Sequence, residues 1–308
     1  MLSILTGVSP LVLIVSQENG TVKAPPRVPP GYRLFWRDEF SGTIGSPPNP
    51  RFWNHETGAS GWGNNELQNY VKDGEHARIV ADPAAVDRKA LQIKVTSEGP
   101  GKYTSARLQT AGKVSIQYGY IEARIRLPYG QGIWSAFWML GSDIFNPEVG
   151  WPKCGEIDIM ENIGKREWWG RNEGSLHGPG YSGADSLHEY IDMPEGVFFK
   201  DGYHLFAILW EKDRVEFYVD GKKYRTRTPA DIPGKPWAFN RPFFLVTNVA
   251  VGGNFPGSPD ETTIFPQEMR IDYVRIYRKA SDNKPAAVAP GKGKVGGGTG
   301  KVLIDGED

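Results

Sequence analysis

The chain has 308 residues, with 36 basic and 36 acidic side chains and a formal net charge of zero. Because no overall positive field exists to gather a polyanion, we expect no nucleic-acid partner, and a neutral ligand fits better. The 38 Gly, the 24 Pro and the aromatic fraction of 12% favour many short strands joined by turns, and a chain of this length can form one all-β domain.

The start of the chain resembles a targeting segment. Residues 1–16 are almost uncharged and contain an apolar run at 11–15, which is similar to the core of a signal peptide although a basic n-region is missing. The run is too short to span a membrane. We therefore expect a secreted protein with no membrane span.

Composition divides the chain into three parts. Residues 1–30 contain the leader and a Pro-rich stretch at 25–30, which predicts an extended linker. Residues 280–308 are rich in Gly and Lys and lack aromatic residues, which predicts a flexible tail. The folded domain is therefore expected over 31–279, as a monomer. Its single cysteine, Cys154, cannot form an internal disulfide.

Alternating polar and apolar residues predict the strands of this domain. In the clearest case Ile121, Ala123 and Ile125 alternate with polar residues, so they should face the core. Asp220-Gly221 supplies the positive φ angles of a tight hairpin. The expected strands cover residues 91–96, 120–127, 203–211, 215–219, 243–250 and 269–278. Together they predict an all-β fold of two packed antiparallel sheets.

Two tryptophans share one face of a further predicted strand. Trp134, Ala136 and Trp138 alternate with Phe137 and Met139, which are left for the core. Two indoles beside a small residue can form a flat platform on which a sugar ring stacks. The alternative is that both tryptophans belong to a packed core.

The next strand carries acidic residues. Glu156 and Asp158 lie on one face, and Ile157 and Ile159 lie on the other. Glu161 is then out of phase by one residue. Either the strand ends just before it, or a β-bulge absorbs one residue and returns Glu161 to the carboxylate face. We expect the bulge.

With the bulge, these carboxylates can perform acid and base chemistry. Glu156 and Glu161 would lie roughly 13 Å apart at Cα, and their carboxyl groups could approach to about 6 Å. Retaining glycosidases need about 5–5.5 Å and inverting ones about 6.5–9.5 Å, so the spacing favours retention without deciding it. Crowded carboxylates do not all ionise easily, which yields one acid and one nucleophile. We assign Glu156 as the nucleophile, Asp158 as the middle group that orders protons and hydrogen bonds, and Glu161 as the acid/base. A solvated acidic strand face is the alternative.

At these residues the sequence resembles glycoside hydrolase family 16, in its laminarinase-like branch, whose acidic motif carries an extra methionine, here Met160. Four other segments resemble blocks of the same branch in the same order. They are SGWGNNELQ at 60–68, YTSAR at 103–107, LHGPGY at 176–181 and VGGNFPG at 251–257. The resemblance covers about residues 32–278.

The resemblance implies a β-jelly-roll sandwich with a concave cleft, and retaining endo-hydrolysis of β-1,3-glucan without a cofactor for the chemistry. Asn65 and Arg107 would bind sugar hydroxyls, Trp134 and Trp138 would line the cleft, and His177 would lie close to the acid/base. The alternatives are a turn residue for Asn65, a surface ion pair for Arg107 and a loop histidine for His177.

The resemblance also suggests a structural calcium ion on the convex face, near Asp272 and Glu39, although a lone Asp in a strand is usually only a polar residue. Two positions depart from the pattern of the branch. Ser135 stands where proline is common, and Phe255 stands where tryptophan is common.

Other functions remain open. A glucan-binding protein of the same fold would lack the catalytic glutamates, and this chain keeps both Glu156 and Glu161. A hydrolase or transglycosylase acting on mixed-linkage glucan, agarose, carrageenan or xyloglucan is a second alternative. The neutral charge disfavours sulfated substrates among these, and the extra methionine disfavours mixed-linkage specialists.

Overall fold

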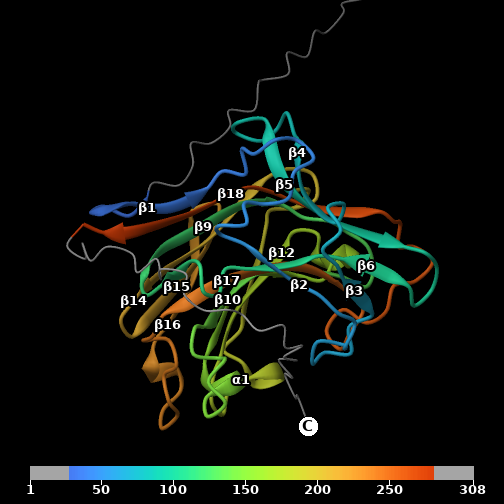
Figure 1. Cartoon of the computed structure of the whole chain (residues 1–308). Helices are drawn as coiled ribbons and strands as arrows, with labels where there is room; N and C mark the ends of the chain where they lie inside the picture. Colours follow the sequence, from blue (N-terminus) through green and yellow to red (C-terminus); the bar gives the residue numbers. More distant parts are fainter. Residues whose placement is uncertain (1–27, 281–308) are drawn as a thin grey trace, which may run out of the picture.

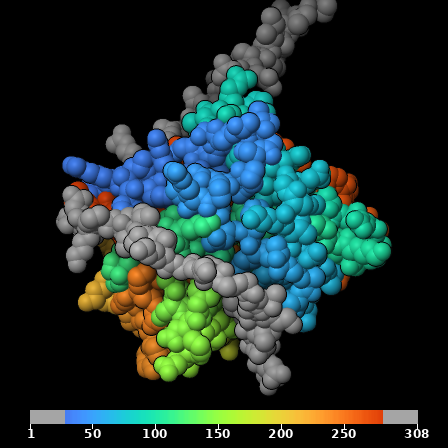
Figure 2. Space-filling model, in the orientation of Figure 1, coloured from blue at the N-terminus to red at the C-terminus, as the bar shows by residue number. Residues whose placement is uncertain are grey.

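The structure, a computed structural model, describes residues 28–280. Most of the expected leader and tail lie outside the described residues. In the space-filling view the described residues form one continuous body (Figure 2).

Two sheets pack face to face (Figure 1). The larger sheet has the order β16-β15-β14-β9-β18-β5-β6-β3, with β1 paired to β18 and β4 paired to β5. Its strands are β1 (Tyr32–Asp38), β3 (Gln68–Tyr70), β4 (Ala77–Ala81), β5 (Lys89–Ser97), β6 (Tyr103–Ser105), β9 (Gly119–Arg126), β14 (His204–Glu211), β15 (Arg214–Val219), β16 (Lys222–Arg227) and β18 (Gln267–Lys279).

The smaller sheet carries the acidic strand. Its order is β13-β12-β11-β10-β17-β7-β2, with β8 paired to β17. Its strands are β2 (Asn54–Glu56), β7 (Arg107–Gln109), β8 (Ser115–Ile116), β10 (Ile133–Gly141), β11 (Glu156–Asn162), β12 (Arg171–His177), β13 (Glu189–Asp192) and β17 (Phe243–Val251). Among the described strands only β3 and β6 pair in parallel, so the expectation of antiparallel sheets is confirmed with that one exception.

Helices are few and short in the described part of the chain. They are α1 (Gly150–Lys153) and the 3-10 turns η1 (Arg166–Trp168), η2 (Gly183–Asp185) and η3 (Pro229–Asp231). None of these helices has the length and apolar character needed to cross a membrane.

The predicted hairpin and the predicted alternation are both present. Asp220 and Gly221 have φ angles of 48° and 75° between β15 and β16. Ile121, Ala123 and Ile125 of β9 are buried in the main core between the sheets. β1 and β18 run side by side, so both ends of the described chain meet at one side of the larger sheet (Figure 1).

The outer face of β9 is less exposed than its polar sequence suggests. Tyr120 and Glu122 are both buried, although we expected only the aliphatic face to be covered. Tyr218 and Tyr277 pack around Tyr120, and the hydroxyl of Tyr277 donates a hydrogen bond to Glu122 at 3.2 Å. Tyrosine side chains from β15 and β18 therefore cover this face, which a single strand's pattern cannot predict.

Candidate active site

A β-bulge in β11 brings the acidic residues to one face. Strand β10 pairs with Met160 and then directly with Asp158, so that Ile159 has no partner. Ile159 and Met160 are both buried in the core between the sheets. The extra residue returns Glu161 to the carboxylate face, as we expected from the sequence.

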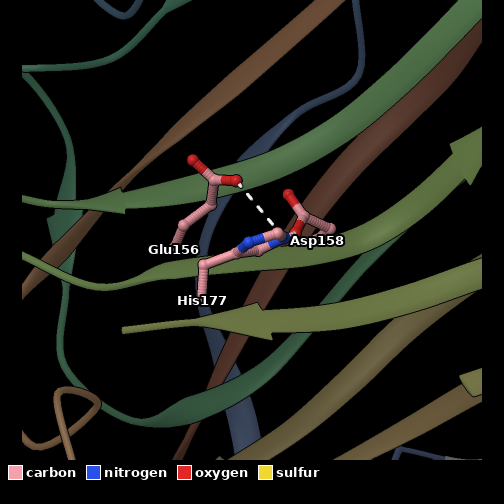
Figure 3. A group of neighbouring side chains, drawn as sticks. All are labelled: Glu156, Asp158 and His177. Atoms are coloured by element: carbon pink, nitrogen blue, oxygen red, sulfur yellow. Dashed lines mark ion pairs between the residues drawn. The ribbon is translucent and has the colours of Figure 1, made fainter. Parts of the chain in front are cut away.

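Glu156, Asp158 and His177 form a compact group (Figure 3). His177 lies opposite Glu156 on the neighbouring strand β12, and its Nε2 is 3.1 Å from Asp158 Oδ2 and 3.7 Å from Glu156 Oε1. Ser175 Oγ donates a hydrogen bond to Asp158 and lies 3.0 Å from the same Nε2. The resemblance placed His177 near the acid/base Glu161, whereas the structure places it beside Glu156 and Asp158.

Two influences act on the protonation of His177. Burial by itself lowers its pKa, but the hydrogen bond with Asp158 and the charges of Glu156 and Asp158 raise the pKa to about 9. The backbone N–H of Gly183 donates to Nδ1 at 3.1 Å, which suits the neutral ring protonated on Nε2. With its proton on Nε2 the ring donates toward the carboxylates, whereas the cation carries a second proton on Nδ1 and gives up the bond from Gly183.

Glu156 has positive groups around it. Burial raises its pKa, and so does the charge of Asp158. The charges of His177 and Arg107 act in the opposite direction, as does a hydrogen bond of 3.1 Å from the Trp151 indole. The net pKa of Glu156 is raised to about 8, but these partners limit the rise and so favour the ionised form that a nucleophile requires.

Glu161 lacks positive neighbours like those that limit the rise in the pKa of Glu156. Burial raises its pKa well above the ordinary value, and the negative charges of Asp158, Glu173 and Glu156 raise it further. The opposing influence is a hydrogen bond of 3.0 Å from the Trp134 indole N–H. Glu161 is therefore the carboxyl that retains its proton, which is the state of a general acid.

Arg107 lies buried between two tryptophans. Its guanidinium carbon is 4.8 Å from the Trp62 ring and 4.7 Å from the Trp138 ring, and its Nε donates to Glu56 Oε2 at 2.5 Å. The ion pair that we considered exists, but it is partly buried: the Arg107 side chain is 7% exposed and that of Glu56 is 23% exposed. The indole N–H of Trp138 donates to Asn248 Oδ1 at 2.8 Å.

The platform of two exposed indoles is not formed as expected. Trp138 is only 6% exposed and packs in a second apolar cluster with Ala136 on this side of the sheet, while Arg107 lies over its ring. Trp134 is half-buried and contacts Phe255, with ring centroids 5.5 Å apart. A contact of Trp138 with sugar stays a prediction.

Asn65 has the conformation of a turn residue. Its φ angle is 55°, and its exposed side chain donates a hydrogen bond of 2.9 Å to Asn254 Oδ1. The alternative of a turn residue fits this backbone. Its expected contact with sugar hydroxyls stays a prediction.

The proposed calcium site does not fit. Asp272 is 1% exposed, and its carboxylate already accepts hydrogen bonds from Arg124 and from the backbone N–H of Val86. Glu39 forms a two-bond ion pair with Arg275, with both N–O distances 2.8 Å. Because arginines satisfy both carboxylates, neither is free to bind calcium.

One other group has the composition of a metal site. The ligand atoms of Glu156, Asp158 and His177 lie within 4.8 Å of one another. A histidine ligand must offer a lone pair to the metal, so a metal here would have to displace the proton that the raised pKa of His177 favours. The group is therefore better described as a hydrogen-bonded ion cluster.

Comparison with known proteins agrees with this geometry. Residues 65–275 match the model of glycosyl hydrolases family 16, and the chain belongs to that family. The structure resembles the catalytic domain of an endo-1,3-beta-glucanase (laminarinase) from Thermotoga petrophila, with a TM-score of 0.73 and 44% identity over 81% of this chain and 98% of that one. It also resembles an endo-beta-1,3-glucanase from Pyrococcus furiosus, with a TM-score of 0.72 and 42% identity over 80% of this chain and 94% of that one.

A curated relative is longer than this chain. The glucan endo-1,3-beta-glucosidase A1 of Niallia circulans is 35% identical over 278 residues, which cover 81% of this chain and 38% of the relative. The chain thus spans less than half of that protein.

Proposed function

We propose that the chain is an endo-acting β-1,3-glucanase that hydrolyses laminarin-like glucan with retention of configuration. The observation that carries the proposal is the bulge in β11, which places Glu156 and Glu161 on one face in unlike surroundings. The similar structures are endo-1,3-beta-glucanases, which supports the choice of substrate.

In the first step Glu156 attacks the anomeric carbon as the bond to the leaving sugar breaks. Glu161 donates its proton to the departing glycosidic oxygen, so that the leaving chain is released as an alcohol. The product is a glycosyl ester on Glu156. The Nε2 proton of His177 and the Trp151 indole hold the attacking carboxylate in place.

In the second step Glu161, now ionised, takes a proton from water. The resulting hydroxide attacks the same anomeric carbon and breaks the ester bond to Glu156, so that two inversions restore the β configuration. Both steps use side chains of this chain alone. Asp158 holds the geometry, because it accepts a hydrogen bond from Ser175 and faces His177.

The test is hydrolysis of laminarin, with the anomer of the earliest product followed by NMR. Fresh β-anomer is expected, and α-anomer as the first product would overturn the retaining assignment. Parallel assays on lichenan and agarose separate the substrate assignment from the mechanism. Release of sugar from agarose or lichenan but not from laminarin would refute the β-1,3-glucan assignment.

A further inference from the structure

A fourth acidic residue faces the active-site strand from its neighbour. Strand β12 pairs with β11 so that Glu173 lies directly opposite Glu161. Side chains directly opposite in an antiparallel pair share one face, with Cβ atoms about 4.5–5.5 Å apart. Glu173 is therefore an immediate neighbour of the proposed acid/base.

The carboxyl group of Glu173 is only partly satisfied. The residue is 7% exposed, and its Oε2 is buried without a hydrogen-bond partner. A buried carboxylate oxygen without a partner costs free energy, and two like charges directly opposite in a sheet repel each other. Packing alone gives no reason for an acid here, whereas a role in the reaction does.

The groups around this pair supply little positive charge to offset the repulsion between the two carboxylates. Around Glu161 and Glu173 are Glu156 and Asp158 on β11, His177 and Arg171 on β12, Trp134 on β10 and Tyr190 on β13. Arg171 is already paired with Asp192 by hydrogen bonds of 2.7 and 2.9 Å, and His177 faces Glu156 and Asp158. The side chain of Tyr190, opposite Glu173, hydrogen-bonds the Glu173 carboxylate.

We propose that Glu173 is a positioning residue for the acid/base: its carboxylate, facing Glu161 across the β11–β12 pair, keeps the proton on Glu161 until the leaving oxygen accepts it. The inference rests on the proposed function of Glu161. It assigns Glu173 to electrostatic control of that residue and not to contact with sugar.

The titration of both groups agrees with this role. Burial and then the charge of Asp158 raise the pKa of Glu173 to about 7. Glu173 therefore gains its negative charge as the pH rises through neutrality. That negative charge opposes the loss of the proton from Glu161. The effect of Glu173 on the reaction should therefore be seen on the alkaline limb of the pH profile.

The experiment compares Glu173→Gln with the wild type through the pH dependence of kcat/KM on laminarin. The substitution keeps the shape of the side chain and removes its charge. We expect the alkaline limb to move to lower pH by about one unit, since a like charge at this separation in a partly buried site has an effect of that order. At pH 5.5, where Glu173 is protonated, the two proteins should have similar kcat/KM.

Glu189→Gln is the matched control. Glu189 lies on β13 opposite Gly174, one residue along from the Glu173–Tyr190 pair and therefore on the other face of the sheet, where it pairs with Arg225. This variant removes the same charge from the neighbouring strand. Its pH profile should match that of the wild type.

The outcomes are distinct from those of the proposed function. An unmoved alkaline limb in Glu173→Gln, or an increase in KM with an unmoved limb, would overturn the inference, and the second result would assign Glu173 to sugar binding. Failure of the wild type on laminarin would instead reject the substrate assignment. In that case 13C NMR titration of the glutamate carboxyl carbons still tests whether the pKa of Glu161 falls in Glu173→Gln.

Discussion

The Nε2 atom of His177 lies 3.7 Å from Oε1 of Glu156, across the pair of strands β11 and β12. Burial and the charge of Asp158 raise the pKa of Glu156, and the charge of His177 limits that rise by favouring the ionised carboxylate. In His177→Ala we expect the acid limb of kcat/KM to move to higher pH, because more Glu156 is then protonated. We also expect kcat to fall roughly 10- to 100-fold as the carboxylate loses its orienting partner.

His188→Ala is the control for this variant. His188 lies just before β13, where its ring contacts Ser186 and Tyr190 instead of the carboxylates of β11. Its pH profile should match the wild type. An unchanged acid limb in His177→Ala would show that the histidine does not act on Glu156.

The nucleophile role predicts a separation of turnover from binding. In Glu156→Ala we expect kcat to fall by at least about a thousandfold, since the covalent step is lost, while the Kd for laminarin oligosaccharides changes little. Single-turnover kinetics and calorimetry on the purified variant measure the two quantities. Glu148→Ala, on the loop between β10 and α1, supplies a control that removes an exposed acid. Substantial turnover in Glu156→Ala would refute the role.

The raised pKa of Glu161 has a consequence for stability. The folded state binds this proton more tightly than the unfolded state, whose pKa is near 4.5, so the wild type loses stability as the pH rises above about 4.5 toward the folded pKa. Glu161→Gln has no ionisable group at this position, so it does not lose this stability as the pH rises. The Tm of Glu161→Gln should equal that of the wild type below pH 4. At pH 7 it should be higher, by about 2–4 °C for each kcal/mol of unfolding free energy that the wild type loses between the two pH values.

Differential scanning calorimetry at pH 4 and pH 7 tests this sign. The variant should also be inactive, so stability and activity change in opposite directions. A lower Tm for Glu161→Gln at pH 7 would mean that the carboxylate is better stabilised in the folded protein than its surroundings indicate.

Much of the fold could be predicted because strand patterns are local. The alternation around Ile121 and the Asp220-Gly221 turn depend on neighbouring residues, and both were confirmed. The bulge at Ile159 could be predicted because Glu161 was out of phase. The jelly-roll topology rested on the resemblance, since periodicity does not show which strands pair.

Features that depend on several distant strands were missed or misjudged. Glu173 lies on β12, which we did not predict as a strand, although Glu173, Ser175 and His177 alternate there and could have indicated it. The burial of Trp138 depends on Arg107, which approaches from β7. Secretion, the monomeric state and the domain boundaries remain predictions from the sequence.

The arginine partners of Asp272 and Glu39 lead to a last prediction about calcium. Arg124 and Arg275 already neutralise these carboxylates, so we expect the Tm to be unchanged by excess EDTA or by added millimolar calcium. A ligand at 100 times its Kd would stabilise the folded state by about 2.7 kcal/mol, which thermal unfolding detects easily. Arg124→Met serves as the informative variant, because it frees the Asp272 carboxylate without removing it. If calcium raises the Tm of Arg124→Met but not of the wild type, the arginine occupies the place of the cation. If calcium also raises the Tm of the wild type, a calcium site exists that does not depend on freeing Asp272, and the prediction is wrong.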